Sequence, residues 1–333
     1  MSLPQNLRQI ILDFPQQFSQ GLSLATDFKI DQQYENIMVF GMGGSAWPAE
    51  ILDSWLNNFQ KDYIIEVCRN YHLPPRILPK TLLIFCSYSG NTEEPLTVYQ
   101  EAKKAQLPMA AITSGGQLKE NCLADQVPLV EIPAGLVPRL ATGYLFAVLA
   151  QIIAAAVPNS IDQALMTLIS NLSQELKPAD LEKKGQELAQ KIKGKTPLIY
   201  TSDRLKVLGY IWKIKLNETA KTPAFSNCFP ELNHNEFSMF TDADLEGLRP
   251  IVLMLQDEAD QRQVIKRMNL SAEVIRSKKI PVGMISVEGP NLINRIFSSI
   301  ILSDWVAGYL AQIYQVDPLA TQLQENFKKE LRA

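Results

Sequence analysis

The sequence has few of the residues that bind metals or form disulfides. Among its 333 residues are two histidines and four cysteines, and no two cysteines form a C-x-x-C pair. His72 and His234 lie far apart, and neither belongs to a Cys/His/carboxylate cluster with the spacing of a zinc site. Cys68 and Cys86 fall inside apolar runs, where cysteine behaves as a small hydrophobic residue. The sequence therefore predicts no metal at a catalytic site.

An excess of positive charge is also missing. The chain has 32 Lys and Arg against 35 Asp and Glu, a formal net charge of −3, and no basic block is interleaved with aromatics. Proteins that bind nucleic acid need a basic surface to neutralise phosphates. The sequence therefore predicts no nucleic-acid partner.

Segments for membrane insertion are missing as well. The apolar segment 144–157 is shorter than the roughly 20 residues that a membrane-spanning helix requires, so we expect a buried helix there. Residues 1–8 lack the charged region, apolar core and cleavage site of a signal peptide. We expect no membrane partner and a cytoplasmic location.

Apolar strands alternate with helices along the chain, and the length suggests roughly two domains. Strands that are apolar throughout, without alternation, are typical of a parallel sheet covered on both faces. The pattern breaks near residue 158, which predicts one domain at 1–157 and a second at 158–333 that repeats the first without its glycine turn. We expect strands at 36–40, 63–68, 81–86, 108–113, 128–132, 198–202, 250–255 and 281–287. We expect helices at 5–21, 47–58, 92–105, 140–156, 205–221, 261–278 and 291–314, two more within 161–193, and a short charged helix at the tail.

Two turns rich in small residues follow buried strands. One is Gly43-Gly44-Ser45, after the strand at 36–40, and the other is Ser87-Tyr88-Ser89-Gly90-Asn91-Thr92, after the strand at 81–86. A strand-to-helix turn presents free backbone N–H groups and the positive end of a helix dipole, which favour an anion. Parallel strands end at one edge of a sheet, so both turns are expected to face one phosphate. The predicted phosphate-binding residues are Gly43, Gly44, Ser45, Ser87, Ser89 and Thr92.

Two other interpretations of these turns are open. The second turn alone is also compatible with an ordinary helix cap. Gly41-x-Gly43-x-x-Ala46 satisfies a relaxed dinucleotide fingerprint, but its acidic partner, Glu66, lies inside a strand instead of at its tip. Ser45 also places a hydroxyl where a pyrophosphate needs bare backbone. We therefore expect no nucleotide cofactor.

Several separated motifs together resemble the sugar isomerase (SIS) domain, and more narrowly the bifunctional phosphoglucose/phosphomannose isomerases. The resemblance covers essentially the whole chain and is carried by Gly41-Met42-Gly43-Gly44-Ser45, Ser87 to Thr92, Pro138-Arg139, Leu216-Asn217-Glu218, Glu231-Leu232-Asn233-His234-Asn235-Glu236, and a tail with Thr321 and Lys328. The fold it implies is α/β, with two SIS-type three-layer α/β/α subdomains, each containing a mostly parallel sheet covered by helices.

The resemblance implies a metal-independent and cofactor-free aldose–ketose isomerase. Glucose 6-phosphate and mannose 6-phosphate would be interconverted with fructose 6-phosphate through a cis-enediolate. By resemblance, Glu218 moves the proton between C2 and C1, Arg139 meets the negative charge of the enediolate, and His234 opens the sugar ring. In the family this histidine is contributed across a dimer interface, so the resemblance also implies a homodimer. Taken alone, Glu218 is compatible with a solvated helix glutamate, and Arg139 with a residue that caps a loop carbonyl.

Two further residues match the family in the tail. Lys328 resembles a lysine that assists at the ring oxygen and hydroxyls, but Lys329 beside it leaves the register open. Thr321 matches a small hydroxyl residue that leaves room for rotation about C1–C2, and so for both enediolate faces. The bulky pair Trp47-Pro48 departs from this pattern, and its effect on the pocket is open.

Two alternative functions are considered beside the first. One is an isomerase of another phosphosugar, such as an amino sugar. The other is a non-catalytic SIS module that binds a sugar phosphate and regulates a partner. A regulator is expected to have lost the base or the histidine, whereas this sequence has both Glu218 and His234.

Overall fold

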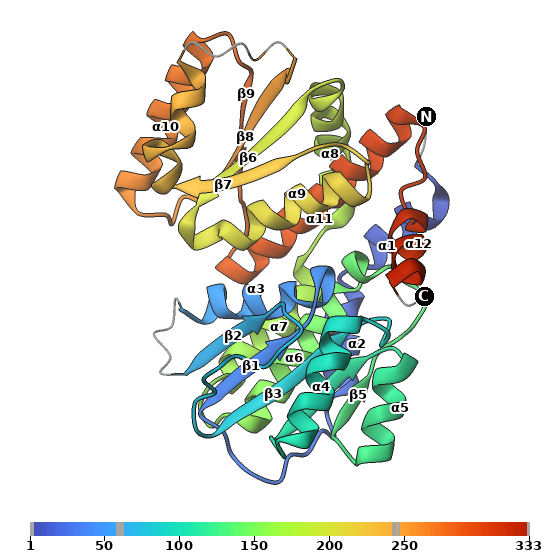
Figure 1. The fold of residues 1–333 in the computed structure, drawn as a ribbon. Helices are drawn as coiled ribbons and strands as arrows, with labels where there is room; N and C mark the ends of the chain where they lie inside the picture. The colour runs from blue at the N-terminus through green and yellow to red at the C-terminus, as the bar shows by residue number, and fades with distance from the viewer. Residues whose placement is uncertain (1–2, 58–62, 242–244, 246, 332–333) are drawn as a thin grey trace. The chain divides into compact units, whose positions relative to one another are not determined.

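The computed structural model describes residues 3–57, 63–241, 245 and 247–331, and the chain forms two compact units (Figure 1). The N-terminal unit is Asp13–Leu176, and the C-terminal unit is Lys177–Ala333 together with Met1–Leu12. The sequence places the domain boundary at residue 157, whereas the chain leaves the N-terminal unit only after Leu176. The reason is that helix α7 (Gln163–Glu175) packs against α2 (Gln16–Leu24) and α6 (Thr142–Ala156) of the N-terminal unit.

A five-stranded parallel sheet forms the centre of the N-terminal unit, with strand order β2-β1-β3-β4-β5. The strands are β1 (Asn36–Phe40), β2 (Ile64–Cys68), β3 (Thr81–Ser87), β4 (Met109–Thr113) and β5 (Leu129–Glu131). In the pairing of β1 with β3, Phe40 lies opposite Phe85. The turns that follow β1 and β3 therefore start at the same edge of the sheet, as the sequence predicts.

Helices cover both faces of this sheet. They include α3 (Trp47–Leu56), α4 (Glu93–Lys104) and α5 (Gly116–Asp125). On one face, α4 and α5 pack against the stacked rings of Phe40 and Phe85, whose centroids are 5.1 Å apart. The connection from β1 to β2 runs towards one edge of the sheet, and the connection from β3 to β4 runs towards the other edge. Because connections between parallel strands are right-handed, α3 and α4 lie on opposite faces of the sheet. The result is a three-layer α/β/α unit.

The C-terminal unit repeats this topology with a four-stranded parallel sheet of order β7-β6-β8-β9. Its strands are β6 (Thr196–Ser202), β7 (Phe225–Phe229), β8 (Pro250–Gln256) and β9 (Val282–Ser286). Its longer helices are α1 (Gln5–Asp13), α8 (Pro178–Ile192), α9 (Lys206–Glu218), α10 (Arg262–Ser277), α11 (Leu292–Tyr314) and α12 (Gln322–Leu331). Helix α10 packs on one face of the sheet, while α9 contacts β6 and β7 and packs against α11. The predicted fold class is confirmed.

The structure differs from the sequence predictions at three places: one predicted helix is divided, and one helix and one strand are additional. The single helix predicted at 5–21 is two helices, α1 and α2, because Pro15 is the N-cap of α2 and has no backbone N–H to continue the first helix. Helix α5 and strand β7 were not predicted. Strand β7 is an edge strand with an exposed Phe225, so it lacks the continuous apolar pattern of the other strands. The last residue of the helix predicted at 47–58 lies outside the described residues.

Helix α11 is the one helix, in the part of the chain that the structure describes, whose length and composition would allow it to cross a membrane. However, 83% of its apolar window is buried inside the structure. Its mean hydropathy therefore reflects its place in the core of the C-terminal unit, between α8 and α9.

Candidate active site

The first glycine turn follows β1 and makes a close backbone contact. Gly43 has φ +49°, and Gly43–Ser45 form a single 3-10 turn. A Cβ on Gly44 would lie 2.9 Å from both the backbone nitrogen of Arg139 and the carbonyl carbon of Pro138. Only glycine allows this approach, so the sequence at Gly44 fixes the distance between this turn and the backbone at Arg139.

Hydroxyl groups link the predicted phosphate-binding turns to each other. The Oγ of Ser45 accepts a hydrogen bond of 3.1 Å from the backbone N–H of Tyr88. Within the second turn, the hydroxyls of Ser87 and Thr92 are 2.9 Å apart. Thr92 is the N-cap of α4 but makes no side-chain cap bond to the helix, so an ordinary cap does not account for its position. The structure thus brings the two predicted turns together.

The second turn is also held by the loop that follows β4. Gly90 has φ +67°, and a Cβ there would come within 1.7 Å of the carbonyl oxygen of Gly115. Ser114 donates to the carbonyl oxygen of Tyr88 through both its N–H (2.9 Å) and its hydroxyl (2.6 Å). Ser89, by contrast, is exposed, and its Oγ accepts a long bond of 3.3 Å from the N–H of Asn91. The turn is therefore rigid and presents Ser89 to solvent.

Arg139 lies in a 3-10 turn, Pro138–Leu140, directly before α6, and it is 2% exposed. Gln17 of α2 holds this segment. Its Nε2 donates to the carbonyl oxygen of Leu140 at 2.8 Å, and its Oε1 accepts from the N–H groups of Gly143 (3.1 Å) and Tyr144 (3.3 Å). These N–H groups belong to the first turn of α6, where a helix has no carbonyl oxygen of its own to accept their hydrogen bonds. Gln17 is thus an N-terminal cap supplied by a distant helix, and the sequence analysis did not identify it.

Tyr88 connects the Arg139 loop to the second turn. Its hydroxyl donates to the carbonyl oxygen of Pro133 at 2.8 Å and accepts from the N–H of Leu136 at 2.9 Å. Burial raises the pKa of this phenol, which keeps it protonated and able to donate. The sequence motif assigns no role to Tyr88, whereas in the structure its hydroxyl holds the loop that carries Arg139.

Trp47 and Pro48, whose effect on the pocket the sequence left open, are both buried at the start of α3. The indole of Trp47 is 0% exposed. Their bulk therefore fills the interior of the N-terminal unit at the beginning of that helix.

In the C-terminal unit, Glu218 is the last residue of α9 and is half-buried. Lys221, which has φ +53°, donates from Nζ to the carbonyl oxygen of Glu218 and, at 2.8 Å, to that of Ala320. Ala320 directly precedes Thr321. The structure thus brings Glu218 and the Thr321 segment together through a lysine that the sequence analysis did not name.

His234 ends a short 3-10 turn, Glu231–His234, and is exposed. Within the described part of the chain, its side chain has no hydrogen bond or ion pair. The residues around it are anchored: Asn233 donates to the hydroxyl of Ser271 at 2.9 Å, and Glu236 accepts from the hydroxyl of Tyr200 at 2.6 Å. A fixed loop therefore presents a free imidazole at the surface of its unit.

The tail residues are the least constrained candidates. Thr321 is half-buried directly before α12, and Lys328 is exposed on that helix, 3.0 Å from the carboxylate of Glu325. Helix α12 has no buried residue, and Lys329 is exposed as well. The choice between Lys328 and Lys329 therefore stays a prediction.

The C-terminal unit has paired charged side chains at the edge of its sheet that corresponds to the two turns of the N-terminal unit. Beyond the ends of β6 and β8, Arg204 lies 2.7 Å from Asp257 and 2.9 Å from Asp260, and Arg295 lies 3.1 Å from Asp257. The hydroxyl of Ser202 also donates to Asp260 at 2.9 Å. Guanidinium and carboxylate groups of the chain itself pair with one another here, in place of the glycines and short hydroxyl side chains found at the corresponding edge of the N-terminal unit.

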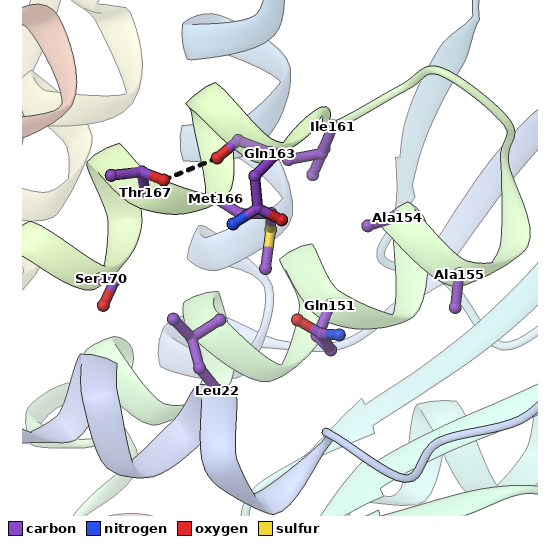
Figure 2. Close-up of a pocket in the computed structure, with 9 residues that line it drawn as sticks. All are labelled: Leu22, Gln151, Ala154, Ala155, Ile161, Gln163, Met166, Thr167 and Ser170. Carbon is purple, nitrogen blue, oxygen red and sulfur yellow. Dashed lines mark hydrogen bonds between the residues drawn. The ribbon is translucent and has the colours of Figure 1, made fainter.

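A surface pocket of about 520 Å³ lies elsewhere in the N-terminal unit (Figure 2). It is lined by Leu22, Gln151, Ala154, Ala155, Ile161, Gln163, Met166, Thr167 and Ser170. None of these is a candidate site residue or carries a titratable side chain. The same figure shows the hydroxyl of Thr167 bonded to the carbonyl oxygen of Gln163, within helix α7. This pocket is therefore separate from the candidate active site.

Comparison with known proteins establishes the family. The model for the bacterial phospho-glucose isomerase C-terminal SIS domain matches residues 181–331. A protein named bifunctional phosphoglucose/phosphomannose isomerase, from Caldicellulosiruptor bescii, is 34% identical over 96% of this chain and 97% of its own. The chain belongs to the bifunctional phosphoglucose/phosphomannose isomerase family. The resemblance seen in the sequence is confirmed.

Two other matches show how widely this family's fold is shared. A D-glucosamine-6-phosphate 4-epimerase from Sulfolobus acidocaldarius is 32% identical over 66% of the chain and 68% of its own. The solved C-terminal domain of glucosamine-fructose-6-phosphate aminotransferase from Francisella tularensis superposes with a TM-score of 0.70 at 12% identity, over 94% of this chain and 97% of that one. At this identity the match supports the fold alone.

The cap that Gln17 places on α6 gives the first prediction. Gln17→Leu leaves one carbonyl and two N–H groups near Arg139 without their partner, and we expect the free energy of unfolding to fall by about 1–3 kcal/mol. Urea unfolding followed by fluorescence measures this change. Gln16→Leu is the matched control, because Gln16 is the exposed neighbour on the same helix and should change stability by less than about 0.5 kcal/mol. Equal stability of the two variants would contradict the proposed cap.

Proposed function

We propose that this chain is an aldose–ketose isomerase that interconverts glucose 6-phosphate and mannose 6-phosphate with fructose 6-phosphate. The observation that carries the proposal is the 34% identity, over 96% of the chain, to a protein named for both activities. The candidate residues occur in two groups: the two turns with Arg139 in the N-terminal unit, and Glu218, His234 and the tail in the C-terminal unit.

In this proposal the N-terminal unit holds the substrate by its phosphate. Backbone N–H groups of the first turn and the exposed Ser89 would bind the anion, together with the hydroxyls of Ser45, Ser87 and Thr92. The hydroxyls of Ser87 and Thr92 are already bonded to each other. Their bond fixes the turn before substrate arrives, which reduces the entropy lost on binding. The phosphate end of the sugar would then position C1 and C2.

Proton transfer is assigned to Glu218. A carboxylate can accept the proton from C2 and return it to C1, which requires a base that stays in place while the enediolate exists. The bonds from Lys221 to the carbonyl oxygens of Glu218 and Ala320 support such a fixed position. The enediolate is negative, and the buried guanidinium of Arg139 is suited to stabilise it, since a cation in a low-dielectric site needs no reorganisation.

Ring opening is assigned to His234, because an imidazole can both accept and donate a proton near neutral pH. Its exposed position without a partner in the described residues supports donation to the active site of a second copy, and hence a homodimer. Lys328 would assist at the ring oxygen. Thr321 would leave room for rotation about C1–C2, so that both 6-phosphates are accepted. We propose that the reaction needs no metal or cofactor and takes place in the cytoplasm.

One observation supports a second candidate. The relative named D-glucosamine-6-phosphate 4-epimerase shares 32% identity over 66% of the chain. An amino-sugar phosphate is therefore the alternative substrate to test. Because the site's catalytic residue types are present, a purely regulatory role has no comparable support.

The direct test incubates purified protein with fructose 6-phosphate and a chelator, and measures glucose 6-phosphate and mannose 6-phosphate separately. We expect both products, and no product from glucosamine 6-phosphate. Absence of both hexose products would falsify the isomerase proposal. Activity that disappears with the chelator and returns with added metal would overturn only its metal-free part.

Glu218→Gln tests the base. Because the amide cannot accept the proton, we expect turnover to fall by roughly 10²- to 10⁴-fold. Calorimetric binding of a phosphosugar should be unchanged, since in this proposal the two small-residue turns, and not Glu218, bind the phosphate. Glu273→Gln, an exposed glutamate on α10 of the same unit, should keep full turnover. If binding disappears together with turnover, Glu218 has a structural role instead.

The origin of the histidine is tested by combining two inactive variants. A heterodimer of Glu218→Gln with His234→Gln, isolated with two affinity tags, would contain one site with both native residues. We expect it to show about half of the native turnover, since a two-fold dimer has two equivalent sites. If His234 serves its own chain, every site lacks one residue, and the heterodimer will be as inactive as either parent.

A further inference from the structure

A buried ion pair joins the helix that carries Glu218 to the long core helix of the C-terminal unit. The Nζ of Lys215 in α9 lies 2.6 Å from Oδ1 of Asp304 in α11. The two side chains are 0% and 4% exposed. Neither residue is among the candidates for substrate contact, so the role considered for them in the reaction acts through another residue.

Stability alone is a weak reason for such a pair. Removing two charges from water costs free energy, and replacement of a buried pair by apolar residues of similar volume is often neutral or stabilising. Both helices also carry buried apolar residues near these two positions in the sequence: Ile211 and Leu216 in α9, and Ile300 and Ile301 in α11. An apolar pair at these two positions would therefore suit the core at least as well.

The pair does supply a defined geometry. An apolar contact between two helices has no preferred direction, whereas an ion pair has one. A second polar contact links the same helices, from the indole N–H of Trp212 to the hydroxyl of Ser299 at 3.1 Å. Two such contacts, spaced along both helices, fix the rotation of α9 about its axis and its position along α11.

The turn that holds Glu218 depends on the same residues. Lys215 lies one helical turn before Glu218, and its carbonyl oxygen accepts from the N–H of Thr219 at 2.9 Å. The carbonyl oxygen of Leu216 accepts from the N–H of Thr222 at 3.1 Å. A shift of α9 at Lys215 would therefore move Glu218 directly.

We propose that Lys215 and Asp304 are positioning residues that hold the carboxylate of Glu218 in place for proton transfer. The inference rests on the proposed role of Glu218 as the base. Small displacements of a reacting group have large kinetic effects, of the order of 10²-fold for about 1 Å. The charged pair is retained, in this view, for the placement of α9 and not for the stability of the unit.

The test is the double variant Lys215→Met/Asp304→Leu, in which two apolar side chains of similar size replace the pair. We expect a melting temperature at or above that of the native protein, an unchanged KM for fructose 6-phosphate, and a kcat reduced by about 10- to 100-fold. The control is Arg8→Met/Glu182→Gln, which removes an ion pair of the same unit between α1 and α8. This control should keep the native kcat.

Hydrogen–deuterium exchange of residues 213–224 gives a readout that does not depend on turnover. We expect faster exchange of the Thr219 and Thr222 amides in the double variant than in the native protein or the control. A native kcat in the double variant would overturn the proposal, and so would a loss of kcat accompanied by an equal loss of thermal stability. If the native protein lacks isomerase activity, that result contradicts the proposed function and leaves the positioning role to the exchange experiment. If exchange at 213–224 is the same in the double variant and the native protein, that result overturns the positioning role.

Discussion

The parallel pairing of β1 with β3 is the constraint on which the candidate site depends. Because Phe40 lies opposite Phe85, the chain leaves both strands at one edge of the sheet, and the two small-residue turns meet there. The contact of Gly44 with the backbone at Pro138 and Arg139 adds a third segment, which is far from both turns in the sequence. The register and this contact therefore place the two predicted phosphate-binding turns and the backbone of Arg139 in the same region of the N-terminal unit.

The two units have the same strand topology but different chemistry at the corresponding edge. In the N-terminal unit this edge has glycines and short hydroxyl side chains, whereas in the C-terminal unit Arg204 and Arg295 pair with Asp257 and Asp260. These charged side chains bind one another within the unit, whereas the predicted phosphate-binding residues of the N-terminal turns are small and uncharged. The C-terminal unit thus repeats the strand topology of the N-terminal unit but not its small-residue turns. The candidate residues of the C-terminal unit lie at a helix end, in a loop and in the tail.

Buried polar side chains determine the geometry of both groups of candidates. Gln17 caps α6 beside Arg139, the hydroxyl of Tyr88 connects two loops, and Lys215 pairs with Asp304 one turn before Glu218. A buried polar group needs a partner in a defined direction, while an apolar side chain accepts many arrangements of similar energy. In this family member the apolar core stabilises the units, and a small number of polar contacts specify where the candidate residues lie.

Patterns in the sequence are sufficient to predict the parallel α/β architecture, most strands and helices, and the residue types of the candidate site. These features depend on local patterns: an apolar run such as β3, a glycine turn after a strand, and motifs that match a family. Other features become visible only in the folded chain: the exit from the N-terminal unit after Leu176, the strand β7, and the contacts by which Gln17, Tyr88 and Lys221 hold the candidate segments. These contacts join residues distant in the sequence or depend on side-chain direction. A glutamine on a helix has the same local pattern whether it faces water or caps another helix, so its partner is defined only once the chain has folded.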